Sequence, residues 1–523
     1  MANGKAYTDP LHLSLLISRV EAVCREMGAV LRRASFSPNI KDRLDYSCAL
    51  FDAEGRLYAQ AAHIPVHLGS MAWAMKDIVG EVRWEAGDML VLNDPFKGGT
   101  HLPDVTLISP VFYQGALVSF VANRAHHANI GSDTPGSMPV STSLSEEGFL
   151  ISPTLLVKKG VLNQDLLDQL AAIEGLDVSG DLAAQMSANR TGEIRLLEIL
   201  TQEGCSQFQE GIRAVNQYGR RLADNLLVGL PDGVFEFEDY LDDDGVGTVD
   251  IPLKVKIVIT TTAQGTKDLQ VDFTGSSPEV RGNLNCPLSV TAAGVFYAFR
   301  CQMPDYTPSC AGIFDGIHII APKGSLLNAS PPAAVAAGNV ETSMRVVDLV
   351  LGALSKAVPD RIPAASQGTM NNIAMGNHRV TPPWDYYETL AGGQGAHMTG
   401  SGLSAAHSHM TNTLNTPAES VEMHFPVRIK SYALRSASGG SGRFPGGDGL
   451  VREYEFLGPA EVTLLTERRK RGPWGLQGGG SGQPGRNMLD GVEVSAKCYL
   501  KVRAGQLLRV ETPGGGGFGE PID

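Results

Sequence analysis

The sequence predicts an α+β protein with mixed, mostly antiparallel sheets, a helical segment in the middle and a glycine-rich β region at the C-terminus. Three observations lead to this prediction. Apolar residues recur at helical spacing near the N-terminus and again between residues 164 and 230. Strand patterns joined by short turns occur on both sides of that helical segment. The 60 glycines of the chain become most frequent in its last third.

The first predicted helix begins at Pro10, directly after the capping residue Asp9. Apolar residues from Leu13 to Leu31 then follow helical spacing and form one face. A hairpin is predicted next, with strands over 47–51 and 57–60. A further strand over 89–93 precedes a second hairpin, in which residues 105–112 and 116–125 flank a turn at 113–115.

Helices are predicted to dominate residues 164–230, followed by sheet over 234–274 and by helices over 290–300 and 340–357. From residue 422 onward we expect short strands separated by tight glycine turns. These elements suggest four parts. Residues 1–160 form an α/β domain that bears a candidate metal site, 161–230 a helical segment, 231–420 a mixed α/β domain and 421–523 a glycine-rich β region.

Composition excludes several classes of protein. A net charge of −13 argues against a nucleic-acid partner, and the one dense basic run, 468–471, is interpreted as a solvated loop. The acidic run 242–244 is interpreted as a solvated hairpin turn. No apolar stretch approaches the ~20 residues that span a bilayer, and no secretory segment is visible. Seven scattered cysteines without C-x-x-C spacing are typical of reduced thiols, so we expect a cytoplasmic protein without membrane contact.

The segment 93–104 ends in His101-x-x-Asp104, directly before the second hairpin, and His126 and His127 lie at the far end of that hairpin. With the turn centred near Gln114, residues whose numbers sum to about 228 face each other. Asp104 then opposes Arg124, and Leu102 opposes His126.

If the register is shifted by one residue, His101, Asp104 and His126 come together at one end of the hairpin. Two imidazoles and a carboxylate suit a catalytic divalent metal: zinc, manganese or iron. His-x-x-Asp alone is a weak signal, so a structural role for these residues stays open at this point.

Other histidines and acids are weaker candidates. His63 and His67 flank Pro65, and because proline breaks helices we interpret both as loop residues, with His67 as a candidate for lining the site. His407 and His409 alternate as residues on one face of a strand do, which favours a structural or substrate-lining role over a second metal. Asp42 or Asp45, just before the first strand, could supply a fourth ligand or cap the surface.

Several nucleotide and nucleophile motifs are missing from the sequence. It contains no G-x-x-x-x-G-K-[ST] loop, no G-x-G-x-x-G between a strand and a helix, and no G-x-S-x-G elbow. Nucleotide chemistry, if the reaction requires it, would therefore come from another chain.

Motifs along nearly the whole chain resemble the hydantoinase B/oxoprolinase family, which includes the β-type subunits of N-methylhydantoinase, 5-oxoprolinase and caprolactamase. The segments that carry the resemblance are 37–47, 63–69, 93–104, 123–127, 135–139, 147–148, 412–417, 439–443 and 512–517. The sequence departs from the family pattern at Asn129, where many relatives have an acid, and at 174–178, which replace an Asn-x-Arg segment.

The resemblance implies a two-part enzyme. A larger hydantoinase A-type subunit would bind ATP and phosphorylate a small cyclic amide. The present type of chain would hold one divalent metal and hydrolyse the activated ring, in a hetero-oligomer such as α2β2. Two alternatives stay open: a subunit of an ATP-dependent ketone carboxylase of the acetone or acetophenone type, and a non-catalytic scaffold for the ATPase partner.

The family's metal ligands correspond to His101, Asp104 and His126. Its further aspartate corresponds to Asp45, with Asp42 as the alternative. The candidate catalytic residues are then Asp45, Glu147 and His67.

Overall fold

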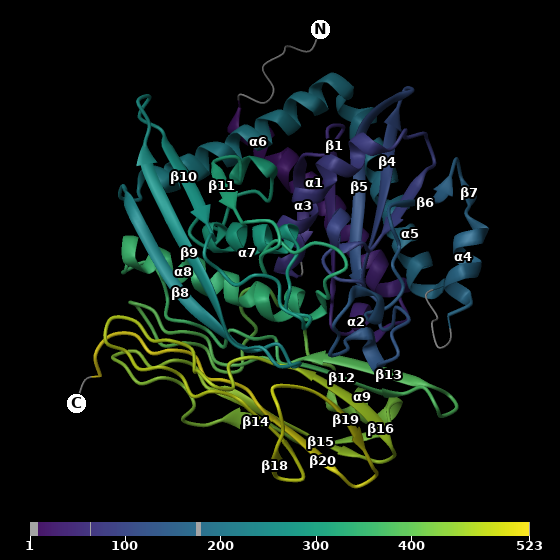
Figure 1. Ribbon diagram of the computed structural model, residues 1–523. Coiled ribbons are helices and arrows are strands. Elements are labelled where there is room, and N and C mark those ends of the chain that lie inside the picture. The colour runs from purple at the N-terminus through teal and green to yellow at the C-terminus, as the bar shows by residue number, and fades with distance from the viewer. Residues whose placement is uncertain (1–8, 63, 174–178, 522–523) are drawn as a thin grey trace.

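Four β-sheets and the helices that pack against them make up the computed structural model, which describes residues 9–62, 64–173 and 179–521 (Figure 1). Most neighbouring strands are antiparallel, and helices are concentrated between residues 164 and 228. The α+β prediction is therefore confirmed. No described helix is long and apolar enough to cross a membrane.

The N-terminal sheet has seven strands in the order β2-β1-β5-β4-β3-β6-β7. Its two predicted hairpins are confirmed. The strands are β1 (Tyr46–Asp52), β2 (Leu57–Ala62), β3 (Met89–Leu92), β4 (Asp104–Tyr113), β5 (Ala116–His126), β6 (Thr154–Lys158) and β7 (Val161–Leu162).

Helices cover both faces of this sheet because successive side chains of a strand point to opposite sides. Cys48 and Leu50 of β1 belong to the same core as the apolar face of α1 (Pro10–Ala34), and α5 (Ser179–Glu203) lies over β4 and β5. Ala49 and Phe51 instead pack in a core with α3 (Pro65–Glu81). The predicted start of α1 is confirmed, since the Asp9 side chain accepts a hydrogen bond from Leu11 N.

The prediction that His67 lies in a loop is wrong, because His67 belongs to α3. Pro65 begins that helix instead of breaking it, as proline has no amide hydrogen to lose at the first helical position. His63 and residues 174–178 lie outside the described residues.

The middle of the chain forms a second sheet in the order β11-β10-β9-β8, with α7 and α8 between it and the N-terminal half (Figure 1). A π-helical turn, Gly338–Thr342, leads into α8. The elements are α4 (Gln164–Ala171), α6 (Cys205–Val228), β8 (Gly233–Asp243), β9 (Val249–Thr261), β10 (Lys267–Asp272), α7 (Leu288–Arg300), β11 (Ile317–Ile320) and α8 (Ser343–Ala357). Shorter helical turns are α2 (Pro38–Lys41), Pro95–Lys97, Pro135–Ser137, Leu144–Glu146 and Ala311–Ile313.

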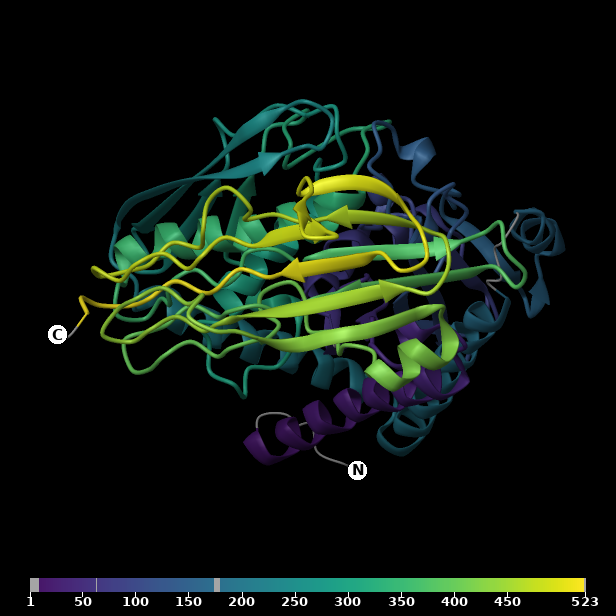
Figure 2. The same cartoon turned by 90° about the horizontal axis from the view of Figure 1, so that it is seen from below.

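Two further sheets form a layer beneath these parts (Figures 1 and 2). One has the order β13-β12-β16-β19 and the other β14-β15-β20-β17-β18, and side chains from both share one core. The first of these sheets contains strands from both sides of the predicted boundary at residue 420. The division of the chain into four parts remains a prediction. The elements are β12 (Asn372–Asn377), β13 (Trp384–Thr389), α9 (Ala418–His424), β14 (Val427–Arg435), β15 (Gly449–Phe456), β16 (Ala460–Leu465), β17 (Arg486–Leu489), β18 (Val492–Glu493), β19 (Lys497–Val502) and β20 (Leu507–Glu511).

Extended glycine segments run side by side at one end of this layer (Figure 2). We call them the glycine bundle: residues 393–395, 439–447, 479–482 and 514–517. Gly515 donates to Gly447 O (2.9 Å) and accepts from Gly440 N (2.8 Å), and a Cβ built on Gly515 would lie 2.0 Å from Gln394 O. As in collagen, only glycine fits where backbones approach this closely. The prediction that these glycines mark tight turns is therefore wrong.

The acidic run lies at the end of the β8–β9 hairpin as predicted. Both charged runs are partly buried, which corrects the prediction that they are solvated; Lys470 and Arg471 alone are exposed. Arg468 is buried, and its Nη2 lies 2.8 Å from Asp239 Oδ2 and 2.6 Å from Asp348 Oδ2. Asp242 is buried too, and its Oδ2 accepts from the backbone N–H groups of Arg469 (2.6 Å) and Lys470 (3.1 Å). The acidic and basic runs thus pack on each other.

Candidate metal centre

The loop before β4 is shaped by buried polar contacts. Asn93 donates from Nδ2 to Leu102 O (2.8 Å) and Phe149 O (2.9 Å), and its Oδ1 accepts from Ile151 N (2.6 Å). Gly99 donates to Asp94 O (2.8 Å), and a Cβ at Gly99 would lie 2.6 Å from Asn93 O. These contacts fix the turn that delivers the residues from Thr100 to Asp104 to the end of the sheet.

In the β4–β5 hairpin, Asp104 lies directly opposite His126. The predicted register, with Arg124 opposite Asp104, is wrong by two residues. The turn is the two-residue pair Gln114–Gly115, both with positive φ, and a bulge leaves Val118 without a partner on β4. Together these features shift β5 along β4, and they bring the two ligand-type side chains closer than the sequence predicted.

His101, Asp104 and His126 form one buried cluster whose three potential ligand atoms all lie within 4.8 Å of one another. Asp104 Oδ1 is 3.1 Å from His101 Nε2 and 3.1 Å from His126 Nδ1. All three side chains are at most 3% exposed. His127, the next residue, points to the other face of the sheet and contacts Gln185 (Nε2 to Oε1, 2.9 Å).

The residues present fit a divalent metal. His101 Nδ1 and His126 Nε2 are buried and have no hydrogen-bond partner, while the other nitrogen of each ring lies 3.1 Å from Asp104 Oδ1. Buried polar atoms are nearly always paired, so unpaired imidazole nitrogens beside a carboxylate call for an ion or a water. A set of two histidines and an aspartate is a donor set of zinc, manganese and iron sites.

The cluster lines a cavity of about 20 Å³. Asp45 lines it as well, whereas Asp42 does not, and the role of either as a ligand stays a prediction. The opposite wall comes from distant segments: the Tyr387 ring stacks on His126 at 4.7 Å between centroids, and Met410 and Thr411 complete the wall. A cavity of this size holds one ion or one water.

The cluster also sets the ionisation of its members. Burial by itself raises the pKa of Asp104, but the charge and hydrogen bonds of the neighbouring histidines hold that pKa well below its usual value. Burial lowers the pKa of His126. Burial also lowers the pKa of His101, but Asp104 opposes this and leaves that pKa raised.

Three further side chains orient the Asp104 carboxylate, all through its Oδ2. Thr100 Oγ1 donates to it at 2.5 Å, Asn339 Nδ2 at 3.4 Å, and His67 Nε2 lies 3.4 Å away. His67 Nδ1 in turn contacts Ser47 Oγ (3.1 Å). Thr100 and Asn339 were not predicted from the sequence. Asn339 comes from the π-helical turn, a feature frequent at functional sites that the sequence does not reveal.

Arg124 was also missed as a site residue. Its buried guanidinium donates to Gly98 O (2.6 Å), Ser70 Oγ (2.8 Å) and Thr106 Oγ1 (2.8 Å). It thereby ties the loop before His101 to α3, the helix that carries His67. Burial lowers the pKa of Arg124 to about 10, so the group stays charged at neutral pH.

Glu147 is fully buried but does not line the cavity. Its Oε1 accepts from Ser141 Oγ (2.7 Å), Val335 N (2.8 Å) and Ala336 N (3.0 Å), while Oε2 has no partner. Burial raises the pKa of Glu147 to about 7.

His407 and His409 do not lie on a strand, so the predicted alternation on one strand face is wrong. They belong to a loop in which His409 has a φ of 57° and its Nε2 lies 3.1 Å from Asp348 Oδ1. Both histidines line a larger cavity beside the cluster.

Comparisons with known proteins identify the family of this chain. The family model Hydantoinase B/oxoprolinase matches residues 9–521. A 5-oxoprolinase 1 of Arabidopsis thaliana is 40% identical over 98% of this chain, and the B-type subunit of a putative D-/L-hydantoinase from a Pseudomonas species is 31% identical over 98%. The chain spans 42% of the length of that 5-oxoprolinase and 90% of that of the hydantoinase chain.

Two solved structures share the fold. An ATP-dependent caprolactamase from Pseudomonas jessenii has a TM-score of 0.89 and 28% identity, covering 98% of this chain and 91% of its own. An acetone carboxylase in a nucleotide-free form has a TM-score of 0.88 over 99% of this chain and 77% of its own, and its 18% identity shows likeness of fold alone. The match of the family model over almost the entire chain makes this protein a member of the hydantoinase B/oxoprolinase family.

Proposed function

We propose that this chain is the metal-dependent hydrolytic subunit of an ATP-dependent cyclic amidase that opens hydantoin, 5-oxoproline or lactam rings. The observation that supports this most directly is the convergence of His101, Asp104 and His126 on one small buried cavity, with imidazole nitrogens that lack partners. The likeness to a caprolactamase and to 5-oxoprolinases supports the class of substrate.

The proposed metal is one divalent ion, zinc, manganese or iron, held by His101, Asp104 and His126, with Asp45 as the fourth ligand or as a base. Such an ion supplies Lewis-acid charge and lowers the pKa of water from 15.7 to about 7. Two of the three side chains have the protonation states that ligation needs: the carboxylate of Asp104 is kept ionised, and burial favours neutral His126. The pKa of His101 is raised beside Asp104, so His101 would release a proton on binding the metal.

Opening the activated ring requires water to add to the carbon of the phosphorylated amide and the ring C–N bond to break, so the departing nitrogen needs a proton. The acyl phosphate that remains is hydrolysed by a second water to the carboxylate and inorganic phosphate. His67 is our first candidate for the proton transfer, because it lines the cavity and its Nδ1 contacts Ser47. Glu147 is the second candidate. Its pKa of about 7 suits proton transfer at neutral pH, but three donors occupy its Oε1 and it lies outside the cavity lining.

The proposed partner is a larger hydantoinase A-type subunit that binds ATP and phosphorylates the amide oxygen. This division of labour is supported by the missing nucleotide motifs in this sequence and by the relative that is named as one of the subunits of a hydantoinase. An assembly such as α2β2 would place both sites in one complex.

The test uses the chain co-purified with its ATPase partner. Metal content and ATP-dependent opening of 5-oxoproline, N-methylhydantoin and caprolactam are measured for the wild type, for His101→Ala and for His318→Ala. His318 is an exposed histidine on β11 and serves as the control. We expect His101→Ala to lose bound metal and at least 100-fold in ring opening, and His318→Ala to keep both. Intact metal and turnover in His101→Ala would refute the assignment.

The same experiment separates the two alternatives. Metal with bicarbonate-dependent ATP use on a ketone, and without ring opening, would move the chain to the carboxylases. A wild-type chain that binds no metal and only stabilises its partner would be a scaffold.

A further inference from the structure

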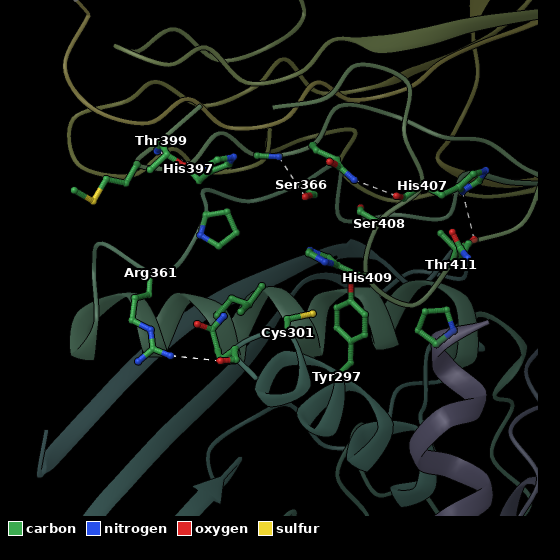
Figure 3. Close-up of a pocket in the computed structure, with 18 of the residues that line it drawn as sticks. Tyr297, Cys301, Arg361, Ser366, His397, Thr399, His407, Ser408, His409 and Thr411 are labelled. Atoms are coloured by element: carbon green, nitrogen blue, oxygen red, sulfur yellow. Dashed lines mark hydrogen bonds between the residues drawn. The ribbon is translucent and has the colours of Figure 1, made fainter. Parts of the chain in front are cut away.

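Figure 3 shows a cavity of about 640 Å³, which we call the outer pocket. It lies beside the metal centre, because Thr411 lines both cavities. At its rim, Arg361, His397, Met398 and Thr399 are exposed. At its other end, His409 and Thr411 are buried. The pocket therefore extends from the surface into the interior, and its volume lies within the range of small-molecule sites.

Only a thin partition separates the outer pocket from the metal cavity. Thr411 lines both cavities. In the segment 64–66, Pro65 faces the outer pocket while its two neighbours face the metal cavity. In the segment 409–413, residues 409 and 412 face the pocket while 410 and 413 face the metal cavity. The partition is thus a single layer of residues.

The metal cavity is closed to any ring. Its volume of about 20 Å³ exceeds only slightly the ~10–15 Å³ that one water needs. A cyclic amide can therefore reach His101, Asp104 and His126 only if part of the wall moves. His409 lies in the partition with a φ of 57°, a left-handed conformation that is uncommon for a residue with a large side chain.

The interior of the outer pocket offers unused hydrogen-bonding groups. His407 Nε2 and Ser408 Oγ are buried and have no partner. Burial, aided by Arg43, lowers the pKa of His407 to about 4, so its ring is neutral at neutral pH. Its Nδ1 contacts Thr411 Oγ1 (3.4 Å), which leaves Nε2 as one donor or acceptor beside the Ser408 hydroxyl group. The formally charged lining residues, Asp360 and Arg361, are both exposed and opposite in sign. An uncharged amide, which carries one donor and one acceptor, matches this interior.

We propose that the outer pocket binds the cyclic amide through His407 and Ser408, and that movement of the 409–413 segment admits the ring to the metal cavity. The identity of the ligand rests on the proposed function, whereas the position of the pocket does not. The arrangement explains how a site with almost fully buried ligands receives a substrate far larger than its cavity.

Cys301 allows a test that needs no turnover. Cys301 is an exposed residue whose thiol is partly enclosed where it lines the outer pocket, and Cys205 on α6 is a reference thiol outside it. The full chain with its partner is treated with N-ethylmaleimide at about pH 8.5, because burial raises the pKa of Cys301. Modification of each cysteine is followed by peptide mass spectrometry, with and without saturating caprolactam, N-methylhydantoin or 5-oxoproline. We expect at least fivefold slower modification of Cys301 with one of these rings and no change at Cys205. Equal rates at Cys301 with and without all three rings would overturn the proposal.

A second test blocks the pocket. Ser408→Trp fills the interior, Ser408→Ala removes only the hydroxyl group, and Leu403→Trp places the same bulk at an exposed position. We expect Ser408→Trp to keep its metal and lose at least 100-fold in ring opening, Ser408→Ala to raise KM about fivefold with kcat retained, and Leu403→Trp to match the wild type. If Ser408→Trp opens rings at the wild-type rate, the pocket proposal is wrong while the hydrolase stands. If the wild type opens no ring, the hydrolase proposal fails and protection of Cys301 still decides the pocket.

Discussion

A single added methyl group should disrupt the glycine bundle. In Gly515→Ala the new Cβ would lie 2.0 Å from Gln394 O and 2.2 Å from Gln394 C, whereas real Cβ atoms essentially never approach closer than 3.0 Å. The segments must therefore separate by about 1 Å. That movement stretches the two hydrogen bonds that join these segments, from Gly393 N to Pro513 O (3.0 Å) and from Ala396 N to Gly516 O (2.9 Å), beyond bonding distance.

The expected cost follows from these two bonds. Taking about 1–3 kcal/mol for each buried backbone bond that is broken, Gly515→Ala should lower the free energy of unfolding by about 2–6 kcal/mol. This is a large share of the ~5–15 kcal/mol by which proteins are stable. A matched control is Gly458→Ala, because a Cβ at Gly458 meets nothing within 4 Å and that glycine does not have positive φ.

Urea unfolding followed by circular dichroism measures the effect. We expect a clear drop in the midpoint for Gly515→Ala and a change within about 0.5 kcal/mol for Gly458→Ala. If both variants unfold within about 1 kcal/mol of the wild type, the close packing of the bundle is not what requires glycine there.

Two further predictions concern buried charge. Burial raises the pKa of Glu147 from 4.5 to about 7, so its contribution to stability is complete below pH 4.5 and is lost as the pH rises through 7. The free energy of unfolding of Glu147→Gln, measured by urea unfolding relative to the wild type, should therefore rise by up to about 3 kcal/mol between pH 4.5 and pH 8. A difference between the two proteins that stays constant or falls as the pH rises would contradict this prediction. Arg468→Met removes the closer of the two buried arginines that Asp239 and Asp348 share, leaving Arg345 at 3.4 and 3.9 Å, and should cost about 3 kcal/mol. Arg471→Met removes a half-exposed pair with Asp250 and should cost less than about 1 kcal/mol. Similar losses in both variants by thermal unfolding would refute this contrast.

Local patterns in the sequence were sufficient for much of the fold. The cap and apolar face of α1, the two hairpins of the N-terminal sheet and the helices between 164 and 228 depend on residues close together in the chain, and the structure has them where the sequence predicted. The register of the β4–β5 hairpin was missed because a bulge at Val118 has no local signal.

Distant contacts set the limits of sequence reasoning. Arg468 is buried against Asp239, and Asp242 against the backbone of Arg469, and each contact joins residues more than 220 positions apart. Neither charged run could therefore be distinguished from a solvated loop by its own sequence. The metal centre was likewise predictable only where its residues are close together in the chain. His101, Asp104 and His126 could be placed together because one hairpin carries them, whereas Tyr387 and Asn339 reach the cluster through tertiary packing alone.

The layout of the centre along the chain also bears on its assembly. His101, Asp104 and His126 lie on one short hairpin, while Thr411, which helps to close the cavity, comes 285 residues after His126. At the ~5–20 residues per second of protein synthesis, the ribosome needs roughly 15–60 seconds to reach that closing segment. During this interval the hairpin can emerge and form while its polar side chains still face the solution around the ribosome. An ion captured in that interval would be enclosed by the later arrival of Tyr387 and Thr411, so the cation most available to the nascent chain would have the advantage over one offered to the finished protein.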